Sequence, residues 1–312
     1  MRAVVLGGGG FVGSHFCSAL AAAGHEVVAA VRRPPAAMPC ADVAVLDAAD
    51  PGALRGLLRR TAPDAVVNAA GAVWRADGAA MEASNVVLVE RLLAVLPELG
   101  RTPRLIQLGT IHEYGSAPGG GVLREDTVPA PLTPYGRTKL RATEAVLAAV
   151  RAGRADAVVL RVANVIGPGA PAGSLLGMVT ELLAGARAAG RTATIRLASL
   201  GGHRDFADVR DVAGAVLLTA VPGTPAPRLV NIGGGRAVSV RSLVERLIEI
   251  SGVPAELVTG TAPPSSPGAA AGSQRLGIDR ARTALGWRPR RSPEESLRAL
   301  WAAAMEQKEA VG

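Results

Sequence analysis

The chain has 312 residues, of which 49% are hydrophobic and 19% are charged. This composition excludes an intrinsically disordered chain and a coiled coil. A chain of this length can bury about 75% of the surface that its unfolded form exposes, so it needs no metal or disulfide to hold a core together. We therefore expect one large globular domain, or two that share a core.

No apolar run approaches the roughly 18 residues of a membrane span. The N-terminal stretch MRAVVLGGGGFVG lacks the layout of a signal peptide, because its apolar part is short and ends in glycines. These features predict a cytosolic protein with no membrane partner. The two cysteines, Cys17 and Cys40, are too few for a disulfide framework or a zinc site, so no metal is expected.

The net charge of +8 favours an anionic partner. Nucleic acid would be such a partner. However, the arginines are scattered along the chain and aromatic residues make up only 3% of it, so neither a basic helix nor a base-stacking surface is expected. We favour an arginine-rich composition in which a few arginines face a phosphorylated ligand.

The first 170 residues alternate short β-branched runs with alanine-rich helical stretches. This alternation predicts parallel strand pairing with right-handed crossovers, and hence an α/β fold with a Rossmann-type doubly wound parallel sheet. Continuously apolar strands fit a sheet that is covered on both faces. Strands are expected at 4–6, 26–31, 41–46, 65–69, 104–108 and 157–162, and helices at 12–23, 51–60, 79–96 and 135–152.

The composition changes after Gly167, where proline and glycine become frequent. We predict a dinucleotide-binding domain over 1–167, to which 206–235 returns, and a smaller C-terminal α/β substrate-binding domain made of 168–205 and 236–312. The elements expected here are helices at 174–189 and 209–220, strands at 194–197 and 228–232, a loop at 261–272, and a helical tail at 279–304 that breaks at Pro289.

A glycine-rich turn, Gly7-x-x-Gly10-x-x-Gly13, joins the first expected strand to the first expected helix. Glycines at this junction permit a tight turn and close approach of the backbone to a pyrophosphate, and the helix start at Phe11 and Val12 offers free N–H groups to the phosphates. The position of the motif favours a dinucleotide site over a turn that is merely rich in glycine.

The residues after the second strand select the cofactor. An acid there would bind a ribose 2′-hydroxyl, whereas an arginine accommodates a 2′-phosphate. The chain has Arg32 and Arg33 and no acid, which favours NADP(H) over NAD(H); the competing interpretation is a solvated surface pair. Asp47, after the third strand, could accept a hydrogen bond from the adenine amine, or be a turn or helix-cap residue.

Tyr135 and Lys139 are four residues apart, which places them on one face of the expected helix. Both residue types are scarce, since the only others are Tyr114 and Lys308. A neighbouring ammonium favours the phenolate, so we expect Lys139 to lower the pKa of Tyr135 from its usual value near 10 and make it a proton-transfer group at neutral pH. Lys139 could also hold the cofactor ribose. The competing interpretation is an amphipathic surface pair.

The chain resembles the extended short-chain dehydrogenase/reductase family, the group of NAD-dependent epimerases and dehydratases that act on nucleotide sugars. The resemblance covers nearly the whole chain. It rests on the GxxGxxG turn, Asn85, and the segments PDAVVNAAG (63–71), LGTIHEYG (108–115), TPYGRTK (133–139), LRVANVIGPG (160–169), HRDFADVRDVAGA (203–215), VNIGGG (230–235) and LGWRP (285–289).

The resemblance implies roles for particular residues. Thr110 would hydrogen-bond the reacting sugar oxygen, Tyr135 would be the general acid/base, and Lys139 its partner. Arg204 would bind the substrate pyrophosphate, with Arg275 as a second clamp, since an arginine fork suits phosphate oxygens. For Arg204 the competing interpretation is a salt bridge to Asp205 or Asp208.

Further residues are expected around the cofactor and the sugar. Asn164 would lie near the nicotinamide or the sugar. The cofactor cleft would be lined by Ala69, Ala70, Gly71, Leu108 and Val162.

The resemblance also implies a homodimer that pairs through the helices 79–96 and 135–152.

Departures from the family pattern indicate the reaction. Family 4,6-dehydratases place Asp-Glu directly after the catalytic threonine, because elimination needs those acids to move protons. Here Ile111 and His112 follow Thr110. Ile111 can do neither task, which argues against a dehydratase. His112 could assist a proton transfer or shape the substrate pocket, and we place it among the substrate-binding residues.

The cofactor residues favour a reductase. Family epimerases mostly bind NAD with an acid after the second strand, whereas Arg32 and Arg33 suit an enzyme that takes up NADPH and releases NADP. We therefore expect NADPH-dependent reduction of the 4-keto group of a (d)NDP-4-keto-6-deoxyhexose. The alternatives are a nucleotide-sugar 4-epimerase with tightly bound NAD, a reductase of a non-sugar ketone, and a nucleotide-sensing protein without chemistry.

Overall fold

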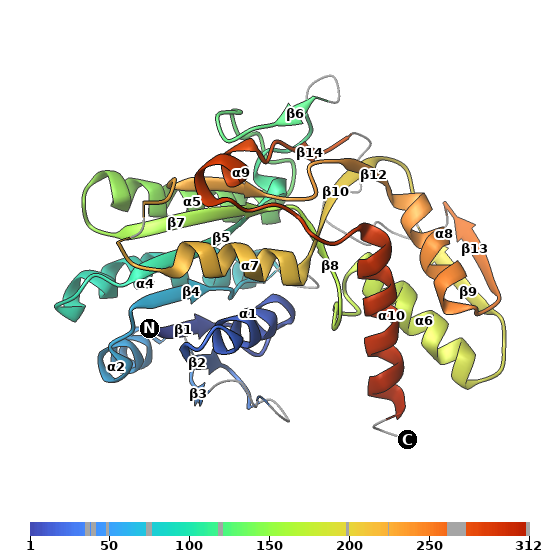
Figure 1. Ribbon diagram of the computed structural model, residues 1–312, viewed down its shortest axis with the longest axis horizontal. Coiled ribbons are helices and arrows are strands. Elements are labelled where there is room, and N and C mark those ends of the chain that lie inside the picture. Colours follow the sequence, from blue (N-terminus) through green and yellow to red (C-terminus); the bar gives the residue numbers. More distant parts are fainter. Residues whose placement is uncertain are drawn as a thin grey trace.

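The computed structural model describes residues 1–34, 38, 42–47, 50–72, 77–117, 121–197, 200–223, 225–260 and 273–309. Cys40 and the predicted loop 261–272 lie outside these residues. Figure 1 shows a layered α/β body beside a second group of helices and short strands, with the last helix running between them toward the C-terminus.

A sheet of seven strands forms the centre of the α/β body, and every neighbouring pair in it is parallel. Its strands are β1 (Arg2–Leu6), β2 (Glu26–Val31), β3 (Asp42–Val45), β4 (Ala65–Asn68), β5 (Arg104–Thr110), β7 (Asp156–Val162) and β11 (Leu229–Ile232). Their order across the sheet is β11-β7-β5-β4-β1-β2-β3. The predicted Rossmann-type doubly wound sheet is confirmed.

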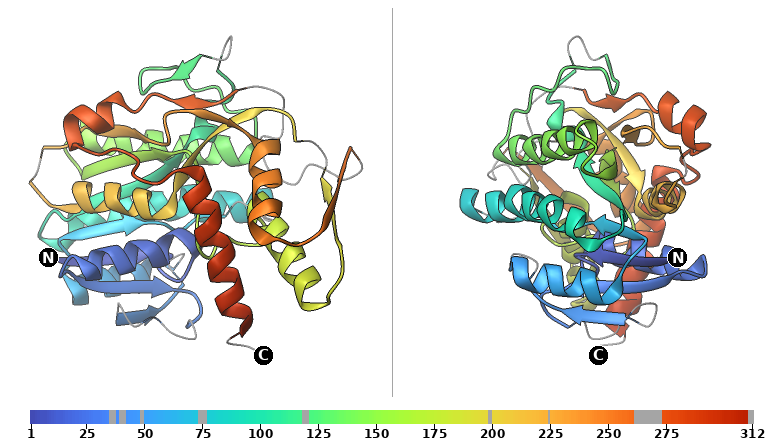
Figure 2. Two further views of the ribbon diagram at one scale, coloured as in Figure 1. Left: turned by 45° about the vertical axis from the view of Figure 1, so that its right-hand side comes forward. Right: turned by 90° about the vertical axis from the view of Figure 1, so that its left-hand side faces the viewer.

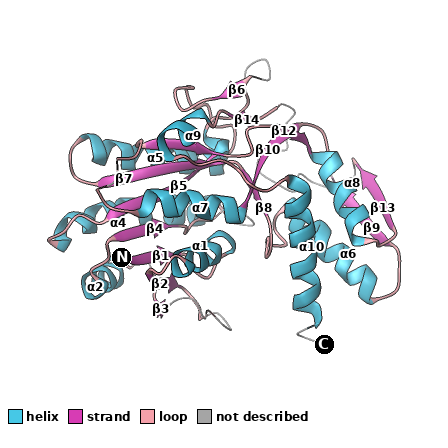
Figure 3. Cartoon of the chain, in the orientation of Figure 1, coloured by secondary structure: helices cyan, strands magenta, loops and turns pink. Residues whose placement is uncertain are grey.

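Helices cover both faces of this sheet (Figure 3). Side chains alternate between the faces along a strand, so Val5 packs into one apolar layer while Val4 and Leu6 pack into the other. The first layer takes helices α1 (Phe11–Ala22), α7 (Val209–Ala220) and α9 (Asp279–Leu285), and the second takes α2 (Pro51–Thr61), α4 (Leu88–Val95) and α5 (Pro134–Arg151).

The helix predicted over 79–96 differs from the expectation. It consists of α3 (Gly78–Glu82), a π-helical turn η1 (Ala83–Val87), α4, and a 3-10 turn η2 (Leu96–Leu99). A π turn inserts an extra residue into the helix and changes the direction of its side chains. Here it accompanies Asn85, which is only 1% exposed and whose side chain bonds to Ala72 and Thr138.

The second group of elements has its own apolar core. It contains α6 (Leu175–Ala188), β9 (Ala193–Leu197), α8 (Val240–Ser251), β13 (Ala255–Thr259) and α10 (Pro293–Glu309). The predicted break at Pro289 is found between α9 and α10. Three short strands, β8 (Asn164–Ile166), β10 (His203–Asp208) and β12 (Ala237–Ser239), form a separate sheet, and β6 (Val122–Leu123) pairs with β14 (Arg275–Leu276).

Several of these elements were not predicted from the sequence. β10 has the sequence HRDFAD, whose charged residues hide its strand character, and α8 was not predicted although Leu243, Val244 and Leu247 form a buried helical stripe. β11 brings the chain back to the edge of the large sheet. The division into two domains remains a prediction. No described helix is long and apolar enough to cross a bilayer.

Candidate active site

The predicted site residues gather at the carboxyl ends of the central strands, where open parallel sheets bind ligands. Thr110 ends β5 and lies in register with Val162, which ends β7. Leu6, at the end of β1, lies in register with Asn68, at the end of β4. The two turned views in Figure 2 show the helices on both faces of this sheet and the second group of elements beyond it.

The glycine-rich turn between β1 and α1 leaves no room for side chains. Gly7 has φ +76°, and a Cβ there would lie 2.9 Å from the backbone of Ala70. A Cβ on Gly13 would lie 2.1 Å from the Gly7 oxygen. The turn is closed by a hydrogen bond from Gly10 N to Gly7 O of 2.9 Å. Only glycine satisfies these positions, as a dinucleotide-binding turn requires.

The start of α1 is open to an anion. Gly10 is the N-cap residue and contributes no capping side chain. The bond from Ser14 N to Gly10 O is 2.9 Å and closes the first turn of the helix, so the N–H groups of Phe11, Val12 and Gly13 precede the intrahelical ladder. These N–H groups and the positive end of the helix dipole fit a pyrophosphate.

The residues predicted to select the cofactor lie at the neighbouring strand ends. Arg32 and Arg33 directly follow β2 and are exposed. β2 pairs with β1 on one side and with β3 on the other. Asp47 follows β3, is exposed, and accepts a hydrogen bond from Asp50 N on its main-chain oxygen. Asp50, not Asp47, caps α2, so the alternative of Asp47 as that helix cap is wrong.

The segment after β4 is held close to the glycine-rich turn. Ala69 N donates to Leu6 O at 3.0 Å, and Ala70 meets Gly7 as described above. Beyond it, the Asn85 side chain bonds both main-chain groups of Ala72 and donates to the Thr138 hydroxyl at 3.0 Å. A Cβ on Gly71 would lie 2.9 Å from Asn85 Oδ1. Asn85 therefore ties this cofactor-side loop to α5, the helix that carries Tyr135.

Tyr135 stands beside Thr110. A hydrogen bond between their side chains lowers the pKa of the phenol, but burial outweighs it and raises that pKa to about 12, with the Glu113 carboxylate adding to the rise. The expected lowering of the Tyr135 pKa by Lys139 is therefore wrong for this structure. Desolvation penalises the phenolate more than the nearby hydroxyl stabilises it, so Tyr135 is a neutral phenol at pH 7.

Lys139 lies one helical turn beyond Tyr135 and is only 5% exposed. Its Nζ donates to the main-chain oxygen of Leu108 at 2.5 Å. Burial lowers the pKa of Lys139 to about 8, and the negative charge of Glu113 opposes that change. The helix carries both residues inward, which contradicts the amphipathic surface pair.

His112 completes a polar cluster with residues from the second group of strands. Its ring meets that of Tyr135 edge to face, with centroids 5.9 Å apart. Burial and the positive charge of Arg204 lower the pKa of His112 to about 4, against a hydrogen bond with Asn164 that raises it. The imidazole is therefore neutral at pH 7. Asn164 also donates to Asp205 O at 2.9 Å, which joins β8 to β10.

Arg204 lies on β10 and is 8% exposed. The acids considered as its partners are engaged elsewhere: Asp205 accepts from the N–H groups of Gly234, Gly235 and Leu276, and Asp208 pairs with Arg210 at 2.7 Å. Burial lowers the pKa of Arg204. A guanidinium held this deep beside a neutral imidazole suits an anionic ligand.

Arg275 is placed differently from Arg204. It lies on β14 opposite Val122 of β6 and is exposed. No hydrogen bond or ion pair within the described part of the chain connects it to His112 or Arg204. Its neighbour Gln274 is buried instead, and donates from Nε2 to Gly115 O at 2.6 Å, next to the turn that carries His112.

Two residues missed by the sequence reading lie directly behind the catalytic candidates. Glu113 is 0% exposed and Arg161 is 3% exposed, and Arg161 Nε donates to Glu113 Oε2 at 2.6 Å. Thr110-x-x-Glu113 forms a capping box around a short 3-10 turn, η3 (Ile111–Glu113). The spacing S/T-x-x-E is a recognised sequence signal for this motif, so Glu113 was open to detection.

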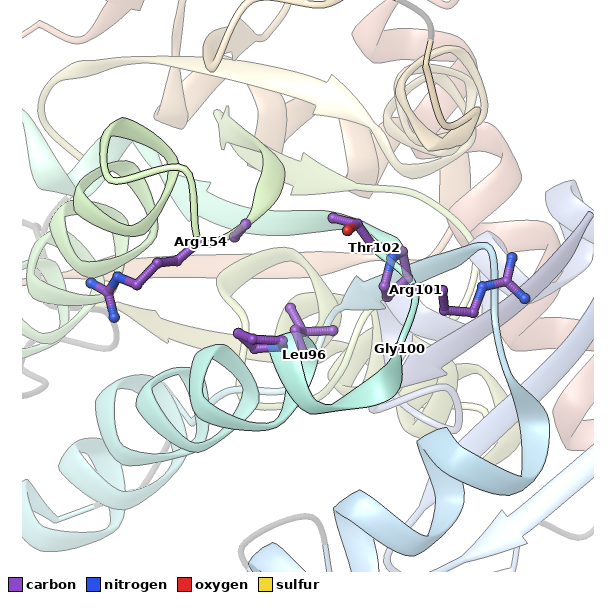
Figure 4. A pocket seen from close by; sticks show the side chains of 8 residues that line it. Leu96, Gly100, Arg101, Thr102 and Arg154 are labelled. Atoms are coloured by element: carbon purple, nitrogen blue, oxygen red, sulfur yellow. The ribbon is translucent and has the colours of Figure 1, made fainter.

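A hollow at the amino ends of the strands, opposite the carboxyl ends that carry the candidate site, is not part of this site (Figure 4). It is lined by residues that precede β5 and β7, among them Leu96, Arg101, Thr102 and Arg154. These residues lie at the amino ends of the strands. Arg101 is engaged there in an ion pair with Asp64.

The site thus joins a dinucleotide turn to a Thr/Tyr/Lys set at the ends of parallel strands. The sequence model of the NAD dependent epimerase/dehydratase family matches residues 3–233. The chain belongs to this family, which confirms the resemblance to extended short-chain dehydrogenases/reductases. It is therefore placed among the oxidoreductases and epimerases of the Rossmann type.

Two individual proteins and one solved structure are similar to this chain over nearly its whole length. The chain is 46% identical to dTDP-6-deoxy-L-talose 4-dehydrogenase (NAD(P)(+)) of Kitasatospora kifunensis, over 97% of this chain and 95% of that protein. It is 31% identical to UDP-glucose 4-epimerase of Azospirillum brasilense, over 93% and 87%. The structure of RMD from Pseudomonas aeruginosa complexed with NADPH is similar, with a TM-score of 0.82 at 26% identity, over 98% of this chain and 99% of that one.

Proposed function

We propose that the protein interconverts the 4-keto and 4-hydroxyl forms of a nucleotide-linked 6-deoxyhexose, with NADPH-dependent reduction as the favoured direction. One observation carries the proposal: the Tyr135 phenol stands beside Thr110 and packs edge to face on His112, next to the buried Arg204. The relative named as a 4-dehydrogenase of a dTDP-6-deoxysugar supports the reaction at C4, because a dehydrogenation and a ketone reduction are one reaction in two directions.

The residues present fit a dinucleotide. Gly7 and Gly13 have no room for a Cβ, and the start of α1 is open to the phosphates. Arg32 would hold a 2′-phosphate, and Ala69 to Gly71 would line the adjoining cleft with Leu108 and Val162. NADP(H) is the favoured cofactor and NAD(H) the other. When bound, the reduced cofactor supplies a hydride.

The proton in the reductive direction comes from Tyr135. With its pKa raised to about 12, the phenol is protonated at neutral pH and can donate to the carbonyl oxygen as that oxygen becomes an alkoxide. An alkoxide is the stronger base, so the transfer runs downhill. Thr110 supplies a second hydroxyl to the same oxygen, which stabilises the developing negative charge.

Arg204 and His112 would hold the nucleotide sugar. The Arg204 guanidinium fits the pyrophosphate oxygens. A neutral imidazole at His112 has one N–H donor and one acceptor nitrogen, so it can orient a sugar hydroxyl beside Tyr135. Asn164 stands beside the His112 ring and would help to orient it. We propose Arg204, rather than the exposed Arg275, as the main clamp on the pyrophosphate.

The experiment is an absorbance assay with two probes. dTDP-6-deoxy-L-talose is supplied with NADP⁺, and its 4-keto oxidation product is supplied with NADPH. The proposal predicts a rise in reduced cofactor with the first probe and a fall with the second, one equivalent for each sugar converted. No change in cofactor absorbance with this pair or with a panel of other 4-keto-6-deoxy sugar nucleotides would contradict it.

A second candidate is a nucleotide-sugar 4-epimerase, which the 31% identical UDP-glucose 4-epimerase favours. An epimerase keeps its nicotinamide and returns the hydride to its own intermediate. It would retain NAD through purification and convert nucleotide sugars without added cofactor. Arg32 and Arg33 favour the reductase, because a family epimerase mostly has an acid at this place.

A further inference from the structure

Glu113 is a buried carboxylate that contacts donors only. Oε1 accepts from Thr110 N at 2.8 Å and from the Thr143 hydroxyl at 3.1 Å, and Oε2 accepts from Arg161 Nε at 2.6 Å. Burial raises the pKa of Glu113, while Arg161 opposes that rise. Because every partner donates a hydrogen, the carboxyl group is ionised.

Arg161, the partner of Glu113, is itself held in place by the Tyr114 ring. The Arg161 guanidinium lies 4.5 Å from the centroid of the Tyr114 ring. The Tyr114 hydroxyl donates to Asn231 Oδ1 at 2.9 Å, and Asn231 belongs to β11. The carboxylate is therefore held by β5, β7, α5 and β11 together, and it has little freedom to move.

The same carboxylate lies against α5, because Thr143, whose hydroxyl bonds to Oε1, follows Lys139 by one helical turn on the same face. Its charge raises the pKa of Lys139 and that of Tyr135. The groups that face Glu113 are thus Arg161 from β7, Lys139 and Tyr135 from α5, the Thr143 hydroxyl, and Thr110 N at the end of β5. Arg161 is paired, whereas Lys139 is bonded to a neutral carbonyl, that of Leu108.

We propose that Glu113 is the positioning residue of this site: it fixes the main chain of Thr110 and supplies the negative charge that keeps the buried Lys139 ammonium in place beside Tyr135. A buried lysine without a counter-charge tends to lose its proton. The contact with Thr110 N sets the direction of the strand end that presents the Thr110 hydroxyl. The roles of Thr110, Tyr135 and Lys139 here rest on the proposed function.

The closeness of the packing supports a dedicated role. A Cβ on Gly109 would lie 2.7 Å from Glu113 Oε1 and 3.1 Å from Arg161 Cγ. Glycine at this strand position therefore makes room for the ion pair. A buried ion pair costs desolvation that an apolar pair would not, so stability alone is a weak reason to place a charge here.

The test uses the scarcity of lysine. The chain has only Lys139 and Lys308, so protein labelled with ¹³C at lysine Cε gives two signals by NMR, and Lys308→Arg identifies the one from Lys139. The full chain is titrated without substrate or cofactor. Wild type should show Lys139 titrating near pH 8.

Three variants are compared in the Lys308→Arg background. Glu113→Gln keeps the shape and removes the charge, and we expect the Lys139 midpoint to fall by about one pH unit. Glu113→Gln combined with Arg161→Met leaves no unpaired buried ion, so it guards against loss of folding. Because it also removes the positive charge of Arg161, it should show a smaller fall in the same direction. Thr143→Val removes one hydrogen bond to Glu113 without changing charge, and should leave the midpoint where it is.

Activity gives the second readout. With the two sugar probes above, the alkaline limb of the pH profile for reduction should move to lower pH in both Glu113 variants and stay fixed in Thr143→Val. A wild-type Lys139 midpoint in Glu113→Gln, or a midpoint above that of wild type in the double variant where only that one folds, would overturn the proposal, whatever the enzyme's reaction. An altered midpoint in a protein that converts neither probe would instead contradict the proposed function and leave the positioning role supported.

Discussion

The imidazole of His112 and the phenol of Tyr135 meet edge to face, with ring centroids 5.9 Å apart and planes inclined by 67°. They come from different elements, and glycine allows the approach: a Cβ on Gly136 would lie 2.5 Å from His112 O. The half-buried imidazole of His112, which packs on Tyr135 in the site, is neutral at pH 7.

The first prediction concerns stability in acid. The pKa of His112 is about 4 in the folded chain and near 6.5 when unfolded, so below pH 6.5 the unfolded chain binds a proton that the folded chain does not. Stability from His112 is thus lost as the pH falls. Lowering the pH from 7 to 4.5 should reduce the free energy of unfolding of both proteins. The reduction should be about 2 kcal/mol smaller in His112→Asn than in wild type.

Urea unfolding at the two pH values measures this difference. Asp205 has a pKa raised to about 6 by burial and contributes with the opposite sign, since its neutral form is favoured in the folded chain as the pH falls. It is present in both proteins, so it cancels in the comparison. Equal losses in wild type and variant would mean that the imidazole titrates as in water.

The second prediction concerns the phenol. Tyr135→Phe removes the proton donor and keeps the ring that packs against His112. The turnover number for reduction should fall about 10²–10⁴-fold, while the dissociation constant of NADPH, measured by fluorescence, should change little. Tyr114→Phe is the matched control: that hydroxyl bonds to Asn231, away from Thr110. Turnover of Tyr135→Phe close to wild type would remove Tyr135 from the mechanism.

The third prediction concerns cofactor choice. Arg32→Asp replaces a donor for the 2′-phosphate by an acceptor for a 2′-hydroxyl, so the ratio of kcat/KM for NADPH over NADH should fall about ten- to a hundredfold. Arg60→Asp, an exposed arginine on α2, is the control for a change in net charge. An unchanged ratio in Arg32→Asp would show that another group reads the phosphate.

The fourth prediction separates the two arginines. Arg204→Gln should raise the KM for the nucleotide sugar about ten- to a hundredfold, because one charge-assisted contact with pyrophosphate is lost. Arg275→Gln, at an exposed position, should leave KM unchanged. Initial rates over a range of sugar nucleotide concentrations distinguish them. A larger effect at Arg275 than at Arg204 would reverse the assignment.

Local patterns in the sequence were sufficient for the α/β core. The alternation of apolar strands with helices predicted the parallel sheet, and the spacing of glycines predicted a turn whose lack of space the structure shows at Gly7 and Gly13. The pairing of His112 with Asn164 and Arg204 was less accessible, because it depends on β8 and β10. β8 has only three residues and β10 is rich in charged ones, and the two strands lie side by side only in the folded chain.

The pKa of Tyr135 was predicted in the wrong direction for a related reason. Helical spacing revealed that Lys139 shares its face, but spacing carries no information on burial. In the structure the Lys139 ammonium is bonded to Leu108 O and desolvation of the phenol dominates. Glu113 was missed although its capping-box spacing was visible, since the ion pair joins the turn η3 to Arg161 on β7, 48 residues further along the chain.

The central claim is that hydride reaches C4 of the sugar while Tyr135 supplies the proton. It is tested most directly with NADPH deuterated at the transferred position and the 4-keto oxidation product of dTDP-6-deoxy-L-talose. Mass spectrometry and proton NMR of the sugar locate the label. We predict one deuterium, bonded to C4, for each NADPH oxidised. A converted sugar with no deuterium at C4, or conversion without oxidation of NADPH, would contradict the claim.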